Sequence, residues 1–458
     1  MPRSAKLTTL ETRATAGLAA LYSLRLLGLF LLMPVWSVYA REIPGGEDPR
    51  LMGLALGAYG LTQALLQLPL GMLSDRIGRK RVIYAGLAVF IVGAVVAALA
   101  SNVVGVILGR ALQGAGAISA AITALLADLT REEHRTRAMA VIGMSIGLTF
   151  AGSLVAGPLL HHWIGVPGIF WLTAGLGVLA LIGVASVIPD PGISRFHPET
   201  EANRRWLRDV LRHPQLARLN WGVFALHAAQ MSLFVGIPTA LTQAGLAVEH
   251  HWTIYLPVVL IAFLLMAPAI IVAETRNQLK PVFLAAIALM ALAQWGFTFE
   301  HSTLTALTLG LGVYFVAFNI LEASQPSLVS KLAPAAAKGT AMGVYATLQS
   351  LGAFVGGAAG GWLLHHGGLT PLFAFSASLV VLWFFSALGM KPPLPVKSAI
   401  YHIGETWEGD AAALSARLAM LPGVIEAVVM KEERVALLKV MREGWDEAAV
   451  KQIISETN

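Results

Sequence analysis

The chain of 458 residues is 56% hydrophobic and only 13% charged, with a mean hydropathy of +0.70. These values exclude an ordinary soluble domain, in which about a quarter of the residues are charged. The net charge of +6 would suggest nucleic-acid binding in a soluble chain. Here the basic residues lie in short connections between apolar runs, so we expect no nucleic-acid partner. The absence of Cys excludes disulfides, thiol redox chemistry and Cys-based metal sites.

Apolar runs of about 20 residues recur along the chain, and each is long enough to cross a bilayer as a helix. We therefore predict an α-helical polytopic membrane protein that sits in a lipid bilayer. The predicted spanning helices are residues 14–40, 51–73, 82–100, 102–127, 138–162 and 166–188, then 219–245, 251–273, 281–299, 303–330, 338–366 and 368–390. Two groups of six suggest the internal repeat of a transporter, with one bundle at 1–188 and another at 219–390.

Basic residues separate the connections into two alternating sets. Every connection of one set contains Arg or Lys, whereas the other set contains only Arg41 and Arg50. By the positive-inside rule the first set is cytoplasmic, which places both termini in the cytoplasm. The first apolar run is longer than a signal-peptide core and contains Arg25, so we expect it to be retained.

Two segments outside the spanning helices have a character of their own. The linker 189–218 contains an Arg-rich stretch with an apolar stripe, which we interpret as an amphipathic helix lying against the lipid headgroups. After a second linker at 391–398, a soluble domain is predicted at 399–458. Strand and helix patterns occur there at 400–403, 410–421, 424–430, 435–440 and 445–454. The order βαββα is that of a ferredoxin-like domain without its last strand.

A dense basic turn follows the second predicted helix. Residues 71–80, GMLSDRIGRK, resemble the G-x-L-a-D-R-x-G-R-K signature of the major facilitator superfamily. Gly71 allows a facing helix to approach closely, and Asp75 can accept from the free N–H groups that open another helix. The resemblance implies a conformational latch in which Asp75 meets the eleventh helix near Gly339 and Arg79 pairs with Asp128. Its residues are Gly71, Asp75, Arg76, Gly78, Arg79, Lys80 and Asp128. The alternative is that the basic residues only set the topology.

Two further stretches resemble motifs of this superfamily. Residues 110–117, RALQGAGA, resemble its fourth-helix motif R-x-x-q-G-x-g-a, which implies a role for Arg110 in proton coupling. The alternative for Arg110 is a structural bond to a neighbouring helix. Residues 153–158, SLVAGP, resemble the antiporter motif g-x-x-x-G-P-x-x-G-G through Gly157 and Pro158. The chain departs from this motif at Ser153 and at His161-His162.

Four ionisable residues fall inside predicted spans, where charge is costly unless it is paired or functional. They are Arg25, Arg110, His227 and Glu322. His227 and Glu322 lie at comparable depth and are our leading candidates for a proton-carrying pair, since histidine titrates near neutral pH. The alternative is a structural Glu322 bonded to Asn319 or Gln325. Five polar side chains are candidates for substrate contact or for joining helices: Gln63, Gln67, Gln113, Asn319 and Gln349.

Metal binding is not expected. His pairs recur at the outer connections, 161–162, 250–251 and 365–366, but adjacent residues on a helix face different ways. Interfacial anchoring therefore explains these pairs better than a metal site. The small domain resembles heavy-metal-associated domains around residues 421–424, yet Trp407 and Asp410 stand where the paired cysteines would be. The resemblance implies the fold without the metal chemistry, and leaves regulation, partner binding or self-association open.

The whole pattern resembles the YajR-like subgroup of bacterial drug:proton antiporters, which implies a place in the bacterial inner membrane. We expect a secondary transporter that exports small amphipathic molecules in exchange for protons by alternating access. No Walker A sequence is present, and no nucleophile–base set or cofactor loop points to an enzyme, so we expect no cofactor. The alternatives are proton-coupled uptake of a solute or transition metal, and a sensor that signals through the small domain.

Overall fold

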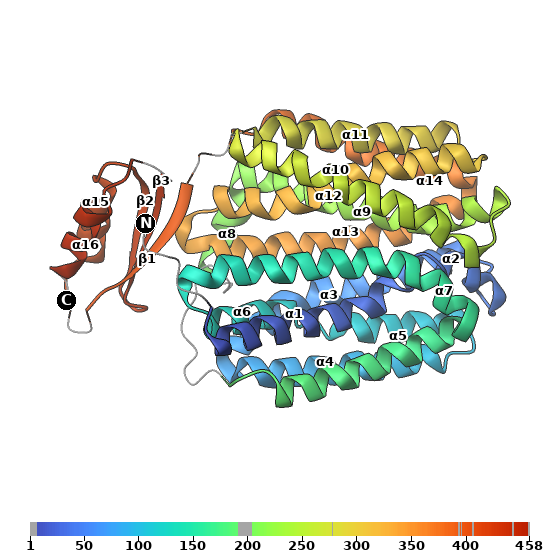
Figure 1. Cartoon of the computed structure of the whole chain (residues 1–458), viewed down its shortest axis with the longest axis horizontal. Helices are drawn as coiled ribbons and strands as arrows, with labels where there is room; N and C mark the ends of the chain where they lie inside the picture. The colour runs from blue at the N-terminus through green and yellow to red at the C-terminus, as the bar shows by residue number, and fades with distance from the viewer. Residues whose placement is uncertain are drawn as a thin grey trace.

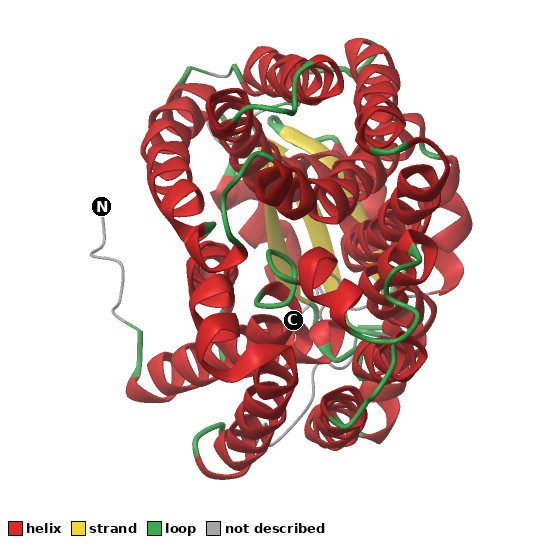
Figure 2. Cartoon of the chain, turned by 90° about the vertical axis from the view of Figure 1, so that its right-hand side faces the viewer, coloured by secondary structure: helices red, strands yellow, loops and turns green. Residues whose placement is uncertain are grey.

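A computed structural model describes residues 7–190, 204–276, 278–392, 394, 396–404, 407–441 and 444–456. Long helices run side by side in an elongated body, and the small domain lies at one end of it (Figure 1). We call this end the basic end, because Arg79 and Arg131 lie there, and the other the opposite end. Figure 2 views the body from the opposite end, with the strands of the small domain behind the helices.

The first bundle provides six membrane-spanning segments. Its helices are α1 (Thr9–Phe30), α3 (Pro49–Ile77), α4 (Arg79–Ala98), α5 (Val103–Ala115), α6 (Ser119–Leu129) and α7 (Glu132–Ser186). The short α2 (Trp36–Tyr39) and the 3-10 turn η1 (Ala40–Glu42) follow α1. Helices α5 and α6 together make one span. Helix α7 makes two, because Gly165 has non-helical torsion angles, φ 66° and ψ 178°.

The second bundle contains six further spans. The linker helix α8 (Arg204–Arg212) leads into it, and its helices are α9 (Pro214–Gln243), α10 (Trp252–Thr275), α11 (Leu279–Phe299), α12 (Leu304–Leu332), α13 (Lys338–Gly367) and α14 (Leu369–Leu388). The 3-10 turns η2 (Val248–His250) and η3 (Ala335–Ala337) lie between them. By length and hydropathy alone, nine helical stretches in the described residues qualify as spans. The other three spans are the second half of α7, helix α1, whose mean hydropathy is lowered by Arg13 and Arg25, and the glycine-rich α13.

Two of the predicted helices are broken in the structure. Helix α1 ends at Phe30, four residues before Pro34, because a proline ring clashes with the carbonyl four residues earlier and offers no N–H group. The predicted helix 102–127 is interrupted between α5 and α6. A Cβ on Gly116 would lie 2.4 Å from the carbonyl oxygen of Gly86, so α4 packs directly against this break. Predicting each as one continuous helix was wrong.

The small domain has the predicted βαββα order. Its elements are β1 (Val396–His402), α15 (Ala411–Ala419), β2 (Val424–Met430), β3 (Val435–Met441) and α16 (Glu447–Ser455). The sheet order is β1-β3-β2, and both outer strands pair with β3 antiparallel. One face of the sheet packs against α15 and α16, where Leu418 and Val450 are fully buried. This arrangement is ferredoxin-like without the last strand.

The other face of the sheet packs against the second bundle at its basic end. Val435 and Leu437 contact Ala335 and Ala336 of η3, the turn that opens α13. Lys439 Nζ donates to the carbonyl oxygen of Ala333 at 3.0 Å. The N–H of Ala335 donates to the carboxylate of Glu426 at 3.2 Å. The domain is therefore docked on the segment between α12 and α13.

Helix α8 completes this docking surface. Val210 is fully buried against the second bundle, and Trp206 packs beside η3 and the sheet. The expectation that the apolar stripe of this helix lies against lipid headgroups is therefore wrong for these two residues. The stripe covers protein because the docked domain and the start of α13 lie next to it.

We expect Leu437→Glu to release the small domain from the bundle. A carboxylate at position 437 replaces the apolar contact with Ala335 and Ala336 and is costly to bury there, so docking is weakened. A single cysteine at the docking surface of this Cys-free chain, Ala336→Cys, should react with a maleimide about tenfold faster or more in the Leu437→Glu background, which corresponds to about 1.4 kcal/mol of lost docking free energy. Ile425→Glu places the same charge on an exposed residue of β2 and serves as the control. Equal labelling rates of Ala336→Cys in the two variants would contradict the docked arrangement.

Candidate functional site

Three side chains from three helices of the second bundle meet at the interface with the first. They are His227 of α9, Glu322 of α12 and Gln349 of α13. Gln349 Nε2 donates to His227 Nε2 at 2.8 Å and lies 3.5 Å from Glu322 Oε1. His227 Nε2 is 3.6 Å from Glu322 Oε2. The structure thus brings together the two residues singled out as a proton-carrying pair, and joins them through a candidate cavity glutamine.

The hydrogen bonds of His227 favour one tautomer of its neutral ring. Its Nδ1 lies 3.1 Å from the carbonyl oxygen of Val223, to which a protonated Nδ1 donates. Nε2 is then left to accept from Gln349. Glu322 keeps one oxygen, Oε2, without a hydrogen-bond partner among the described residues, although 37% of its side chain is exposed. This oxygen is available to hold a proton.

Among the described residues, Glu322 forms no hydrogen bond to Asn319 or Gln325, the neighbours on α12 that the alternative requires. Gln325 accepts instead from Tyr345 Oη of α13 at 3.2 Å. Asn319 is buried one turn before Glu322, and the hydrogen bond found for the carboxylate comes from Gln349. Glu322 is therefore linked to another helix rather than to its own.

An aromatic cluster lies beside this polar group. Phe318 of α12 packs edge-on against the His227 ring, with 6.2 Å between ring centroids. Phe150 of α7 contacts Phe318, Phe315 and Phe234 at centroid distances of 5.8, 6.1 and 6.2 Å. Because Phe150 belongs to the first bundle and its partners to the second, the cluster crosses the bundle interface. Aromatic and apolar side chains of this kind line most small-molecule sites.

Arg25 of α1 lies in a polar chain that also crosses the interface. Its guanidinium donates to Ser119 Oγ at 2.9 Å and to Gln63 Oε1 at 3.3 Å. Gln63 Nε2 in turn donates to Gln67 Oε1 at 3.2 Å and to Ser350 Oγ of α13 at 3.1 Å. One of the candidate cavity glutamines, Gln63, therefore connects the bundles, and a second, Gln67, accepts from it on the same helix. No pattern in the sequence pointed to Ser350. It contacts Gln63 only because α13 packs against α3.

Arg110 is fully buried in α5. It donates to Gln113 Oε1 at 3.0 Å, and its guanidinium carbon lies 4.9 Å from the centre of the Tyr59 ring. This contact with Tyr59 of α3 is compatible with the alternative, in which Arg110 joins its helix to a neighbouring one. The role in proton coupling that the motif implies stays a prediction.

Arg79 is the central residue of the basic turn. Its buried side chain forms an ion pair with Asp75, and its Nε lies 3.4 Å from Asp128 Oδ2 at the end of α6. Its Nη1 donates to Ser74 Oγ at 3.0 Å. Gly78 has φ 102°, a left-handed value that favours glycine between α3 and α4. Several side-chain contacts therefore hold the turn, and Arg79 meets Asp128 as the motif implies.

The remaining latch residues differ in their surroundings. Arg76 is exposed, whereas Lys80 pairs with Asp190 at 2.8 Å. A Cβ on Gly71 would lie 3.0 Å from that of Ala120, so the close neighbour of Gly71 is α6. Asp75 pairs with Arg79, and its contact with the start of α13 stays a prediction.

Helices α3 and α13 pack backbone to backbone between the middle and the opposite end. A Cβ on Gly53 would lie 2.2 Å from the carbonyl oxygen of Gly357, and one on Gly361 would lie 2.3 Å from that of Pro49. A Cβ on Gly60 would lie 2.5 Å from the carbonyl oxygen of Ser350. The glycines of α13 were expected to allow close packing. Their partners on α3 were missed, although 53, 57 and 60 share one helix face.

The antiporter-motif residues contact the break in α1. A Cβ on Gly157 would lie 2.6 Å from the carbonyl oxygen of Leu31 and 2.8 Å from the Pro34 ring. Pro158 follows within α7. Gly157 therefore permits the non-helical segment after Phe30 to pack against α7.

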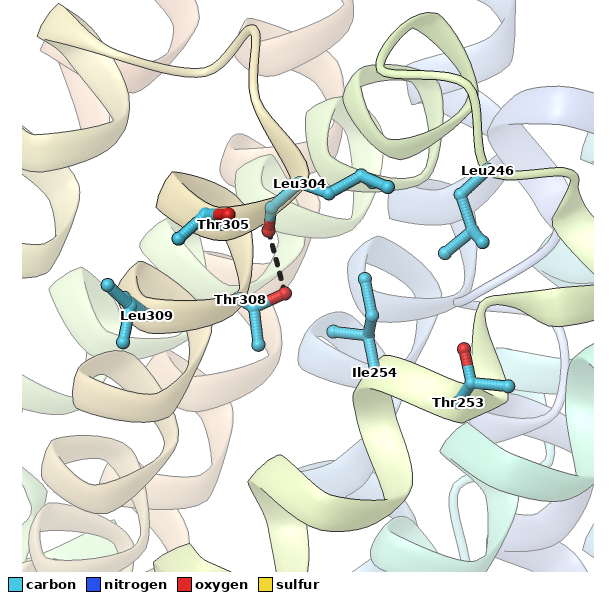
Figure 3. Close-up of a pocket in the computed structure, with 7 residues that line it drawn as sticks. All are labelled: Leu246, Thr253, Ile254, Leu304, Thr305, Thr308 and Leu309. Atoms are coloured by element: carbon cyan, nitrogen blue, oxygen red, sulfur yellow. Dashed lines mark hydrogen bonds between the residues drawn. The ribbon is translucent and has the colours of Figure 1, made fainter.

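A surface pocket of about 380 Å³ lies elsewhere, at the opposite end (Figure 3). It is lined by Leu246, Thr253, Ile254, Leu304, Thr305, Thr308 and Leu309. Glu322 lies on the same helix about 20 Å beyond Thr308, at 1.5 Å per residue. We assign no role to this pocket.

Among the described residues, no group of three or more His, Asp or Glu side chains is placed to hold a metal ion.

An ion pair at the basic end gives a pH prediction. Glu11 accepts from Arg131 Nε at 2.9 Å, and these bonds hold the pKa of Glu11 well below its ordinary value of 4.5. Glu11→Gln keeps the cap on α1 but loses the charge. The free energy of unfolding at pH 7 should therefore fall by about 1 kcal/mol, which lowers the midpoint of thermal unfolding. A carboxylate whose pKa is lowered by folding contributes stability at pH values above its pKa in the unfolded chain. The difference in unfolding free energy between the wild type and Glu11→Gln should therefore narrow as the pH falls below about 4.5. A difference independent of pH would contradict this assignment.

Two bundles of six spans with a polar and aromatic cluster between them define a membrane transporter, not an enzyme. Residues 18–356 match the Major Facilitator Superfamily, and the chain belongs to that family. Over 454 residues it is 42% identical to the inner membrane transport protein YajR of Escherichia coli (strain K12), covering 98% of this chain and 99% of YajR. The expected resemblance to this family and to its YajR-like subgroup is thereby confirmed.

More distant relatives agree on the family. Multidrug resistance protein MdtH of Proteus mirabilis (strain HI4320) is 27% identical over 347 residues, which cover 74% of this chain and 84% of MdtH. A bacterial homologue of the human lysosomal transporter Spinster, solved in an inward-facing and occupied conformation, has a TM-score of 0.66 at 14% identity. It covers 84% of this chain and 97% of its own. At this identity the likeness shows the fold alone.

Proposed function

We propose that this transporter exports small amphipathic molecules in exchange for protons by alternating access. The observation that carries the proposal is the His227–Gln349–Glu322 group, which lies beside the aromatic cluster at the bundle interface. The similarity to a multidrug resistance protein supports export of drug-like molecules. In this proposal the protein lies in the bacterial inner membrane, and its basic end and both termini face the cytoplasm.

Charge on Glu322 controls closure in this mechanism. An ionised carboxylate is costly to enclose in apolar surroundings unless it has a positive partner. The bundles therefore close over Glu322 when it carries a proton, or when His227 beside it is protonated. Substrate bound against the aromatic cluster and a proton on Glu322 are then exchanged on opposite sides of the membrane. The ion pair of Arg79 with Asp128 keeps the ends of α4 and α6 together while the first bundle moves relative to the second.

The experiment is a proton-flux assay with the purified protein in liposomes that contain a pH-sensitive dye. A panel of lipophilic cations, organic acids, sugars and divalent metal ions is added under a pH gradient, with protein-free liposomes as the control. We expect an amphipathic compound to drive protons in the direction opposite to its own movement. Movement of both in the same direction would favour proton-coupled uptake. Absence of flux across the panel would contradict transport and favour the sensor alternative.

A further inference from the structure

A cluster of hydrogen-bond donors surrounds Tyr59 inside the first bundle. Arg25 of α1 and Arg110 of α5 lie with their guanidinium carbons 5.8 and 4.9 Å from the centre of the Tyr59 ring. Gln113 lies one turn after Arg110 and is bonded to it. All four side chains are at least 97% buried. We call these four residues the donor cluster.

The donor cluster has more donors than the surrounding protein can satisfy. Five of its atoms have no hydrogen-bond partner among the described residues: Arg25 Nε, Arg110 Nε, Arg110 Nη2, Gln113 Nε2 and Tyr59 Oη. Each of these atoms can donate a hydrogen bond. The acceptors that the two arginines do reach, Ser119 Oγ, Gln63 Oε1 and Gln113 Oε1, are all neutral.

The sequence offers these two positive charges no carboxylate at this depth. No Asp or Glu occurs at residues 12–41, 49–74, 76–127 or 138–189, which are the apolar parts of the first bundle. Glu322 belongs to the second bundle, where it is engaged by Gln349 and His227. Cations buried without a counter-charge are costly, and nearby groups or ligands normally compensate them.

The donor cluster is connected to the interface between the bundles. Arg25 is bonded to Gln63, which is half-buried and bonded to Ser350 of the second bundle. A carboxylate that enters between the bundles can replace the neutral Gln63 oxygen on Arg25, because a charge-assisted hydrogen bond to a guanidinium is the stronger one. When the bundles separate, the bond between Gln63 and Ser350 must break, which frees Gln63 to move.

We propose that the donor cluster binds a singly charged anionic group during the transport cycle. The group is either the carboxylate of an amphipathic organic acid that is transported or a small inorganic anion such as chloride. For the first source the proposal rests on the proposed function and names its substrate class. Arg110 and Gln113 bind the anion, and Arg25 admits it through Gln63.

The test is thermal unfolding of the full-length protein in nanodiscs, followed by Trp fluorescence in a chloride-free zwitterionic buffer. The probes are benzoate, its neutral analogue benzamide, the cation benzylammonium, and chloride. We expect at least one anion to raise the unfolding midpoint, because a ligand that binds the folded state stabilises it. Benzamide and benzylammonium should not raise it. Stabilisation by benzoate that chloride cannot displace assigns the site to an organic acid; stabilisation saturated by chloride assigns it to an inorganic anion.

The variant that tests the site is Arg110→Gln, in which we expect the apparent affinity for the anion to fall at least tenfold. Arg41→Gln removes the same charge from an exposed position and should bind as the wild type does. If Arg110→Gln does not fold, Arg110→Lys, which keeps the charge but loses the planar fork, should show a smaller loss. Equal affinity in these variants, or no stabilisation of the wild type by either anion, would overturn the proposal.

This binding measurement needs no proton gradient and no transport. Anion binding without proton flux would therefore overturn the proposed function and leave the donor cluster as an anion site. Proton flux without anion binding would overturn the present inference and leave proton-coupled export intact.

Discussion

Substrate-driven proton movement is expected to disappear in Glu322→Gln, to the level of protein-free liposomes. Glutamine cannot bind or release a proton, yet it has the same shape and keeps an oxygen that can accept from Gln349. The variant should therefore fold, with an unfolding midpoint close to that of the wild type. The reason for a complete loss is that Glu322 is the only acidic residue in residues 301–404, which contain the last three spans of the second bundle. In our proposal it carries the transported proton.

A second measurement separates coupling from substrate binding. Exchange of labelled for unlabelled substrate, without a pH gradient, should persist in Glu322→Gln because it needs no net proton transfer. Glu300→Gln removes a carboxylate from an exposed connection and should behave as the wild type. If Glu322→Gln kept full proton flux, coupling would have to lie elsewhere, with the Asp75 and Asp128 region as the next candidate.

The second large effect is expected from Gly53→Val. A Cβ at position 53 would lie 2.2 Å from the carbonyl oxygen of Gly357, and 2.8 and 2.9 Å from Cα and N of Gly361. These are backbone atoms, so a side chain cannot move out of the way and α3 must separate from α13. Overpacking of a closed interface typically costs about 1–3 kcal/mol. We expect the opposite end to stay open and transport to fall at least tenfold.

The absence of Cys makes this prediction simple to measure. A single reporter, Leu56→Cys, introduces a thiol at a buried position beside the glycine face of α3 that packs against α13. It should react slowly with a membrane-impermeant maleimide alone and rapidly when combined with Gly53→Val. Gly143→Val is the matched control, since a Cβ there has no neighbour within 4 Å. Protection of the reporter in the Gly53→Val background would contradict the inferred role of this contact.

Much of the architecture could be predicted from composition and local pattern. Membrane thickness requires each span to be a continuous apolar run, so the spans could be counted before any contact was known. The alternation of strands and helices likewise predicted the small domain. The breaks at Phe30 and Ala115 were missed because a proline or glycine within a span is tolerated when a neighbouring helix compensates for it. Whether one does depends on packing, as for Gly86 against Gly116.

The candidate site was likewise predictable in part from sequence, and the rest depends on packing. His227 and Glu322 could be selected from sequence because ionisable residues are rare in apolar helices. Gln349 had been placed only in a general group of polar residues, since a glutamine in a helix can serve packing or function equally well. That it lies between His227 and Glu322 follows from the juxtaposition of α9, α12 and α13.

By itself, therefore, the sequence determined the kind of protein, its twelve spans, the small domain and the residues whose burial needs a reason. Each of these depends on local composition or on the fixed thickness of the bilayer. Only the tertiary structure decided which of those residues meet: the Glu322 group, the donor cluster around Tyr59, the glycine contact of α3 with α13 and the docking of the sheet on η3. These contacts join segments far apart in the chain, and their geometry depends on how helices pack, which no local pattern specifies.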